Sequence, residues 1–247
     1  MTDAFIRYVD LYKAFAGRPV LAGVNLDIGR GESVVILGGS GSGKSVLLRH
    51  AIALHRPDRG EVWVDGTEIS GLDEEDLLET RKKVGMLFQA GALFDSMSVY
   101  RNVALPLHEH TDWEEEKVAA RVAEVLSLVE LSEVEDKMPA DLSGGMRKRV
   151  ALARAIALAP HAVLYDEPTT GLDPITANAI NRLIRGLQAR LGITSIVVTH
   201  DIQSAFHVAD RIAFLYEGKI SFTGTPQEAE ASREPLLREF LRGGVDA

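Results

Sequence analysis

Apolar residues along the chain follow two spacings, one typical of buried strands and one typical of amphipathic helices. Residues 4–28 alternate loosely between apolar and polar positions around a turn at 16–19, which predicts two short strands. Residues 211–224 predict a hairpin. Further strands are predicted where short apolar runs end in polar or turn residues: SVVILG (33–38), EVWVDG (61–66), KKVGMLFQ (82–89), AVLYDE (162–167) and SIVVTH (195–200).

In most of the segments between these strands, apolar residues recur at the spacing of a helix. Residues 114–129 carry one apolar helix face, made by Val118, Val122, Val125 and Val129. Helices are also predicted over 45–54, over 176–192 and after the C-terminal hairpin. The pattern is mostly helical from about 95 to 160, which we interpret as an inserted subdomain. Strands that alternate with helices predict an α/β fold with a mostly parallel sheet.

The composition restricts the class of protein. A chain of 247 residues, 46% hydrophobic and 26% charged, can build one large core and is not typical of a disordered protein. Its net charge of −9 argues against a nucleic-acid partner. The absence of cysteine excludes disulfides and thiolate metal sites. The N-terminal residues show no apolar signal region, and the most apolar stretch, 150–165, is interrupted by charge and proline, so we expect a cytoplasmic protein.

A glycine-rich stretch between the strand at 33–38 and the helix at 45–54 predicts a phosphate-binding loop. It fits the pattern G-x-x-x-x-G-K-[ST] with Gly38, Gly39, Ser40, Gly41, Ser42, Gly43, Lys44 and Ser45. Backbone N–H groups of such a loop surround a β-phosphate, the lysine reaches the β- and γ-phosphates, and the serine hydroxyl binds Mg²⁺. No G-x-G-x-x-G lies here, so a dinucleotide-binding fingerprint is disfavoured.

Polar residues stand at the ends of three predicted strands. Asp166 can hold Mg²⁺ through its water shell, and Glu167 can act as general base on the attacking water. Gln89 could sense Mg²⁺ or this water, and His200 could contact the γ-phosphate. Ligands of open α/β sheets bind beyond the carboxyl ends of the strands, so we expect these residues to face the phosphate loop. An ordinary polar strand end remains the alternative for each of them.

A second glycine-containing stretch, LSGGMRKR (142–149), opens a predicted helix and therefore indicates a second anion site. Its serine and glycines are Ser143, Gly144 and Gly145, and a methionine follows them. The pair His108 and His110 suggests a metal site, but no further ligands stand at zinc spacing, so we interpret both as surface residues.

Together, these stretches resemble the ATP-binding subunits of ABC transporters over nearly the whole chain. The resemblance implies one domain, 1–247, with a P-loop NTPase core. In that core an N-terminal antiparallel β part joins a RecA-like region, with a helical subdomain inserted at about 95–160. The matching positions are Phe15 for adenine stacking, Gly38 to Ser45 for the Walker A loop, Gln89 for the Q-loop, Ser143 to Gly145 for the signature, Asp166 for Walker B, Glu167 for the catalytic glutamate, Asp173 for the D-loop and His200 for the switch histidine.

The resemblance also implies ATP and Mg²⁺ as cofactors, with Ser45, Gln89 and Asp166 around the metal. Two subunits of such proteins pair head to tail, and the signature of one caps the γ-phosphate held by the loop of the other. This homodimer drives an integral-membrane permease from the cytoplasmic face of the inner membrane. The second site would therefore serve the partner's ATP.

Two details narrow the family further. Most signatures read LSGGQ, whereas this one reads LSGGM, and the segment that follows Gln89 is MLFQAGALFDSMSVYRNVALPLHEHT from Met86 on. Both features resemble the ATPases of Mce/Mla-type lipid transporters, which implies phospholipid transport with an Mce-domain protein in the complex. Val46 replaces the common threonine but keeps its backbone N–H, so ATP binding is expected to survive. The alternatives are the ATPase of a small-solute importer and an ABC ATPase that acts outside transport.

Overall fold

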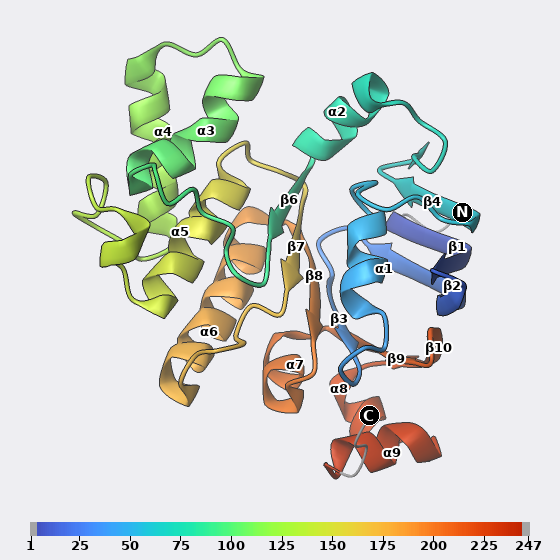
Figure 1. Cartoon of the computed structure of the whole chain (residues 1–247). Coiled ribbons are helices and arrows are strands. Elements are labelled where there is room, and N and C mark those ends of the chain that lie inside the picture. The colour runs from blue at the N-terminus through green and yellow to red at the C-terminus, as the bar shows by residue number, and fades with distance from the viewer. Residues whose placement is uncertain (1–3, 244–247) are drawn as a thin grey trace. The chain divides into compact units, whose positions relative to one another are not determined.

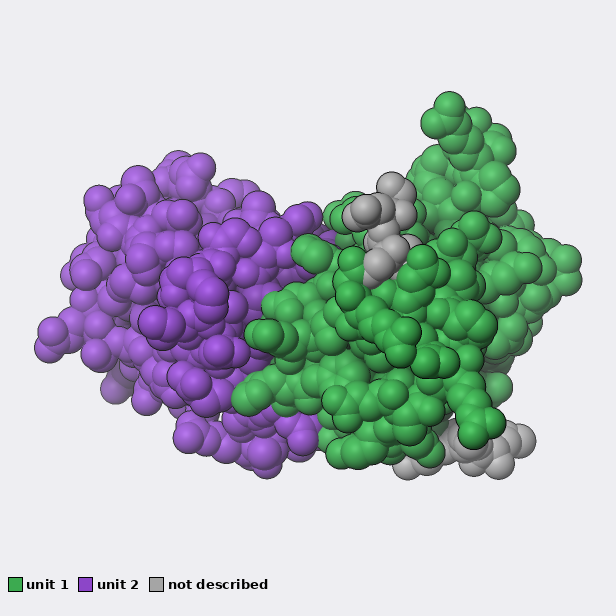
Figure 2. Space-filling view, turned by 90° about the horizontal axis from the view of Figure 1, so that it is seen from below, with its two compact units in different colours: residues 1–81, 194–247 green, residues 82–193 purple. Residues whose placement is uncertain are grey.

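The computed structural model describes residues 4–243. The chain divides into two compact units, residues 1–81 with 194–247 and residues 82–193 (Figure 2). Figure 1 labels most of the helices and strands of both units. Within the described residues, no helix is long and apolar enough to cross a membrane.

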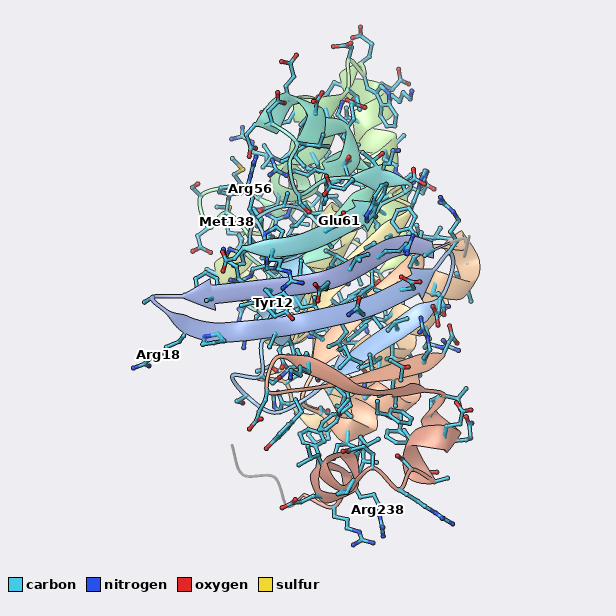
Figure 3. The ribbon with its side chains drawn as sticks, turned by 90° about the vertical axis from the view of Figure 1, so that its right-hand side faces the viewer. Tyr12, Arg18, Arg56, Glu61, Met138 and Arg238 are labelled. Atoms are coloured by element: carbon cyan, nitrogen blue, oxygen red, sulfur yellow. The ribbon has the colours of Figure 1, made fainter. Side chains whose placement is uncertain are left out.

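The first unit begins with an antiparallel sheet of four strands in the order β2-β1-β4-β5. Its members are β1 (Ala4–Phe15), β2 (Arg18–Gly29), β4 (Arg59–Val64) and β5 (Thr67–Glu68). The prediction of two strands over 4–28 is confirmed, but each has 12 residues and is not short. Figure 3 shows this hairpin, with Tyr12 on β1 and Arg18 just beyond the turn. The turn residues Ala16 and Gly17 both have positive φ, which reverses the chain tightly.

A second set of strands includes the buried centre of this unit. It consists of β3 (Ser33–Leu37), β8 (Thr194–Thr199), β9 (Arg211–Tyr216) and β10 (Lys219–Gly224). The strand β3 pairs in parallel with both β8 and β9, and β10 completes the predicted hairpin antiparallel to β9. Every residue of β3 and β8 is buried, which explains their continuous apolar runs.

Helices of this unit pack on these strands or close the chain. They are α1 (Lys44–His50), α2 (Glu74–Lys82), α7 (Ile202–Val208), α8 (Pro226–Glu230) and α9 (Pro235–Leu241). The predicted closing helices are confirmed, whereas α2 and α7 were not predicted. Only Leu77 and Thr80 of α2 are buried, so this helix has no apolar period to detect. The helix α1 ends four residues earlier than predicted, where the chain turns through a positive φ at Ala53.

The second unit combines one pair of strands with a group of helices. Its elements are β6 (Val84–Leu87), α3 (Val99–His110), α4 (Glu115–Leu128), the 3₁₀ turn Pro139–Asp141, α5 (Gly144–Ile156), β7 (Ala162–Asp166) and α6 (Pro174–Leu191). The strands β6 and β7 pair in parallel. The helix α5 contacts α3, α4, α6 and β6, so it lies at the centre of this unit. All four valines predicted for one face of the helix at 114–129 are buried.

A buried asparagine fixes the segment between β6 and α3. Asn102 is fully buried, and its Oδ1 accepts a hydrogen bond from the backbone N–H of Phe94 at 2.8 Å. Its amide nitrogen lies within 3.1 Å of three carbonyl oxygens, those of Phe94, Met97 and Ser98. One side chain therefore replaces the backbone pairing that this segment lacks.

Replacing Asn102 should destabilise the protein, and aspartate should destabilise it more than alanine. Asn102→Ala leaves the buried N–H of Phe94 without its acceptor and removes a donor from the carbonyl oxygen of Met97, which should cost about 2–3 kcal/mol of the free energy of unfolding. Asn102→Asp should cost more, because a carboxylate would face three carbonyl oxygens. Urea unfolding measures both, with Glu109→Ala on the exposed side of α3 as a control expected to stay within about 0.5 kcal/mol. An aspartate variant as stable as the parent protein would contradict this account.

Candidate functional site

The predicted site residues fall into two groups, one in each compact unit. The first unit holds Phe15, the loop from Gly38 to Val46, and His200. The second unit holds Gln89, Ser143, Gly144, Gly145, Asp166, Glu167 and Asp173.

The glycine-rich loop joins the buried strand β3 to α1. A Cβ atom at Gly38 would lie 2.4 Å from the carbonyl oxygen of Leu215, so only glycine fits there. Gly43 has φ of 101° and caps α1 without a side-chain hydrogen bond. Among the described residues, the buried hydroxyl of Ser42 has no hydrogen-bond partner. The loop therefore carries polar groups that a phosphate could satisfy, which fits the predicted nucleotide site.

The lysine of this loop is buried and held over it. Lys44 is 6% exposed, and its ammonium donates to the carbonyl oxygens of Gly38 at 2.8 Å and Gly39 at 2.9 Å. Ser45 and Val46 follow in the first turn of α1 and are half-buried. The positive charge thus lies directly beside the loop backbone.

An exposed aromatic ring ends β1. Phe15 is 41% exposed, and the ring of His55 meets its edge at a centroid distance of 5.3 Å. The ammonium of Lys13 lies 5.5 Å from the same ring centroid and is held by Asp58 at 2.7 Å. A ring exposed to this extent can stack on a flat base. His200, directly after β8, is exposed.

Two carboxylates lie at the end of β7 in the second unit. Asp166 is the last residue of the strand and is 1% exposed. Glu167 follows with φ of 48°, in the left-handed region that residues other than glycine rarely adopt. The hydroxyl of Thr170 donates to its carboxylate at 3.1 Å. Strained backbone of this kind persists where the surroundings hold it, often at functional sites.

Sequence reasoning missed Lys148, which contacts this strand end. Its ammonium donates to the carbonyl oxygen of Gln89 and lies 3.4 Å from that of Glu167. Burial lowers the pKa of Lys148, and the charges of Asp166 and Glu167 oppose that change. Lys148 lies three residues after Gly145 on a buried helix face. One signal in the sequence could have found it: the helical spacing of apolar residues in this segment places Lys148 on the buried face of the helix, where a lysine is unusual.

The signature residues begin α5. Ser143 is exposed and caps the helix, since its Oγ accepts from the N–H of Met146 at 3.2 Å. Ser143 is the acceptor in this hydrogen bond, so the bond does not use the hydrogen of its hydroxyl. A Cβ at Gly145 would lie 2.6 Å from the methyl carbon of Thr176, so this glycine also allows α5 to approach α6 closely. Gly144 has more room, with Leu172 at 3.4 Å from such a Cβ.

Asp173 caps the following helix, α6. Its carboxylate accepts from the backbone N–H groups of Ile175 at 3.0 Å and Thr176 at 3.1 Å, and from the Thr176 hydroxyl. These hydrogen bonds, that of the hydroxyl first, hold the pKa of Asp173 below its usual value. The exposed residue is therefore ionised and locally fixed.

Two predictions remain, one for Gln89 at the end of β6 and one for His108. Gln89 is exposed and lies two residues beyond β6, so the prediction that it ends the strand is wrong: β6 stops at Leu87. His108 is exposed in the last turn of α3, with its Nε2 3.5 Å from the Glu115 carboxylate. In residues 4–243, no cluster of three or more His, Cys, Asp or Glu side chains could hold a metal ion.

Comparison with known proteins decides the family. Residues 21–170 match the sequence profile described as "ABC transporter". The chain belongs to this family. As an ABC ATPase it binds and hydrolyses ATP, and the predicted α/β P-loop NTPase fold is confirmed.

Curated relatives of this ABC ATPase resemble it along almost all of its length. The intermembrane phospholipid transport system ATP-binding protein MlaF of Escherichia coli K12 is 41% identical, over 93% of this chain and 85% of its own. The probable ribonucleotide transport ATP-binding protein mkl of Mycobacterium leprae is 43% identical, over 94% of this chain and 67% of its own. The chloroplastic protein TRIGALACTOSYLDIACYLGLYCEROL 3 of Arabidopsis thaliana is 38% identical, over 99% of this chain and 75% of its own. The chain thus spans only about two thirds of the mycobacterial relatives' length.

Solved structures of ABC cassettes share the fold. The cassette MJ0796, a dimer in a post-hydrolysis state with ADP and Pi, gives a TM-score of 0.82 at 35% identity, covering 90% of this chain and 98% of that one. The protein cbiO1 of Clostridium perfringens is part of the transporter complex cbiONQ. It gives a TM-score of 0.86 at 32% identity, and the match covers 97% of this chain and 96% of that one.

Proposed function

We propose that ATP binds with its phosphates on the loop from Gly38 to Ser45 and its adenine on Phe15. The ammonium of Lys44, held by two loop carbonyl oxygens, supports the first assignment because it can turn to phosphate oxygens of higher charge. The exposed ring of Phe15 supports the second. Val46 contributes its backbone N–H.

Glu167 is proposed as the general base, with Ser45 and Gln89 as oxygen donors to Mg²⁺ and Asp166 holding the metal through its water shell. The observation that carries this proposal is the strand end itself, where a buried aspartate precedes a glutamate fixed in a left-handed backbone and held by Thr170. Mg²⁺ prefers a few carboxylate, hydroxyl and phosphate oxygens, which agrees with this donor set. When bound, it neutralises phosphate charge. His200 is proposed to contact the γ-phosphate.

A head-to-tail homodimer is the proposed active form. The exposed Ser143 at the start of a 13-residue helix, followed by two glycines, could bind a phosphate supplied by another subunit. Asp173, ionised and exposed, would lie at the same interface. A solved relative of the same fold is dimeric, which supports this assembly.

Ser143→Arg should separate binding from hydrolysis. The substituted side chain would occupy the phosphate's place at the dimer interface, whereas the monomer's own loop and Phe15 remain intact. We expect nucleotide affinity within about threefold of the parent protein and hydrolysis reduced at least about 100-fold, as for loss of a transition-state contact. Fluorescent-nucleotide titration and phosphate release measure these, with Ser127→Arg on the exposed face of α4 as the control. Loss of nucleotide affinity in the monomer would contradict the proposal.

The transported substrate is proposed to be phospholipid or a related lipid. Support comes from the LSGGM signature and from the likeness to a phospholipid transport ATPase over 85% of that protein's length. The partners are then an integral-membrane permease and an Mce-domain protein, with the ATPase on the cytoplasmic face of the inner membrane. We also propose that 1–247 forms one nucleotide-binding domain with the helical subdomain at about 95–160. A relative named for ribonucleotide transport keeps a small-solute importer as the second candidate.

Purification from membranes tests the transport proposal. The tagged chain is isolated in mild detergent, its partners are identified by mass spectrometry, and its ATPase activity is measured in vesicles with and without added phospholipid or ribonucleotide. A permease with an Mce-domain protein, and stimulation by phospholipid, are the expected results. Stimulation by ribonucleotide alone would favour the importer, and the absence of any membrane partner would favour a role outside transport.

A further inference from the structure

Lys148 is a buried cation that none of the proposed roles uses. It is 7% exposed, and lysine is almost never so buried unless it is paired. Its partners are the backbone carbonyl oxygens of Gln89 and, at 3.4 Å, Glu167. These two residues lie on separate segments, each of which carries a proposed catalytic group. An ammonium has three donors and no acceptor, so it suits two carbonyl oxygens.

The carbonyl oxygen of Glu167 receives a second hydrogen bond in addition to that of Lys148. The backbone N–H of Thr170 donates to it at 3.3 Å. The same residue fixes the carboxylate through its hydroxyl. Because the peptide at Glu167 is in the left-handed region, its orientation depends on contacts of this kind. Lys148 thus contributes to the orientation of the peptide from which the proposed base projects.

The helix α5 also holds the segment after β6 at further points. The guanidinium of Arg154 donates to the carbonyl oxygen of Gly91 at 3.0 Å. A Cβ at Gly91 would lie 3.5 Å from that of Ala151, so the segment runs in contact with the helix. Lys148, Ala151 and Arg154 follow at intervals of three residues and therefore share one helix face. This face, which begins three residues after the signature glycine Gly145, anchors residues 89–91.

We propose that Lys148 is a positioning residue for ATP hydrolysis. By holding two carbonyl oxygens at once, its ammonium keeps the turn at Glu167 and the backbone of Gln89 at fixed positions on the signature helix. Lys148 thus acts through these two residues, and no contact with the nucleotide is proposed for it. The inference rests on the proposed role of Glu167 as general base and adds a residue outside the nucleotide-binding motifs.

Lys148→Met tests this role, because methionine matches the length of the side chain but cannot donate a hydrogen bond. Displacement of a catalytic group by about 1 Å can cost about 100-fold in rate, so we expect kcat to fall by about 10- to 100-fold. KM for ATP should change by less than about threefold, because the nucleotide contacts are elsewhere. The melting temperature should fall, because the carbonyl oxygen of Gln89 and the two carboxylates lose their buried cation, so kcat is measured well below the melting temperature, where circular dichroism shows the variant folded. Lys148→Arg keeps the charge and donors and should retain clearly more of kcat.

Arg121→Met is the matched control. Arg121 on α4 also donates to two backbone carbonyl oxygens, those of Ile156 and Ala157, but far along α5 from the signature. Its loss should leave kcat within about twofold. Equal kcat losses in the Arg121 and Lys148 variants, or a Lys148→Met variant with kcat within twofold of the parent, would overturn the inference. Glu167→Gln is measured in parallel: if that variant stays active, the proposed base is wrong, whereas an inactive Glu167→Gln beside an active Lys148→Met removes only the role of Lys148.

Discussion

Lys44→Ala is expected to abolish useful ATP binding while the chain remains folded. The ammonium of Lys44 is buried and lies beside the glycine loop, held at 2.8 and 2.9 Å by the carbonyl oxygens of Gly38 and Gly39. Hydrogen bonds between charged groups contribute about 1.5–3 kcal/mol each. Losing those made to the β- and γ-phosphates should therefore weaken ATP affinity by at least about 100-fold. Equilibrium titration with a fluorescent ATP analogue measures the loss.

Two further variants make this result specific. Lys219→Ala removes a lysine from the exposed strand β10 of the same unit and should leave affinity unchanged. Lys44→Arg keeps the charge in a larger, planar group, so it should bind more weakly than the parent protein but better than Lys44→Ala. Unchanged ATP affinity in Lys44→Ala would mean that the phosphates lie elsewhere and would overturn the loop assignment.

Burial on both faces is the feature of this fold that the sequence predicts best. The apolar runs at 33–38 and 162–167 predict buried strands, because a strand covered on both sides need not alternate, and β3 and β7 are buried throughout. Short helices that carry few large apolar residues at their buried positions are harder to predict. The helix α7 illustrates this, since its buried residues are Ser204, Ala205 and Val208. Its one local signal was Asp201, which caps the helix by accepting from the N–H of Gln203.

The candidate site was predictable in residue types but not in conformation. Glycine and lysine at fixed spacing identify the phosphate loop, because few other structures need them together. A sequence does not show, however, that Glu167 has φ of 48° or that Thr170 holds its carboxylate. It also hides the partners of Lys148, because those are backbone atoms of segments distant in the sequence. Side-chain motifs can be read directly, whereas contacts to backbone atoms require the fold.

Glu167→Gln should yield a protein that binds ATP and scarcely hydrolyses it. The amide has nearly the shape of the carboxylate, and its oxygen can still accept the hydrogen bond that the Thr170 hydroxyl donates at 3.1 Å. It cannot accept a proton from water, and general-base catalysis contributes about 100- to 10,000-fold. We therefore expect kcat to fall within that range, with ATP affinity close to that of the parent protein. Phosphate release and nucleotide titration measure the two quantities.

The same variant should accumulate as a dimer with ATP trapped at its interface, because ATP is proposed to join the two subunits and hydrolysis to release them. Size-exclusion chromatography with ATP and Mg²⁺ should show a dimer for Glu167→Gln and mainly monomer for Glu116→Gln, which changes an exposed glutamate on α4. Thr170→Ala should lie between these two in rate, since it frees the carboxylate without removing it. If Glu167→Gln hydrolyses ATP at the parent rate, the base is another group. If it is inactive but stays monomeric with ATP bound, the base assignment stands and the proposed ATP-joined dimer does not.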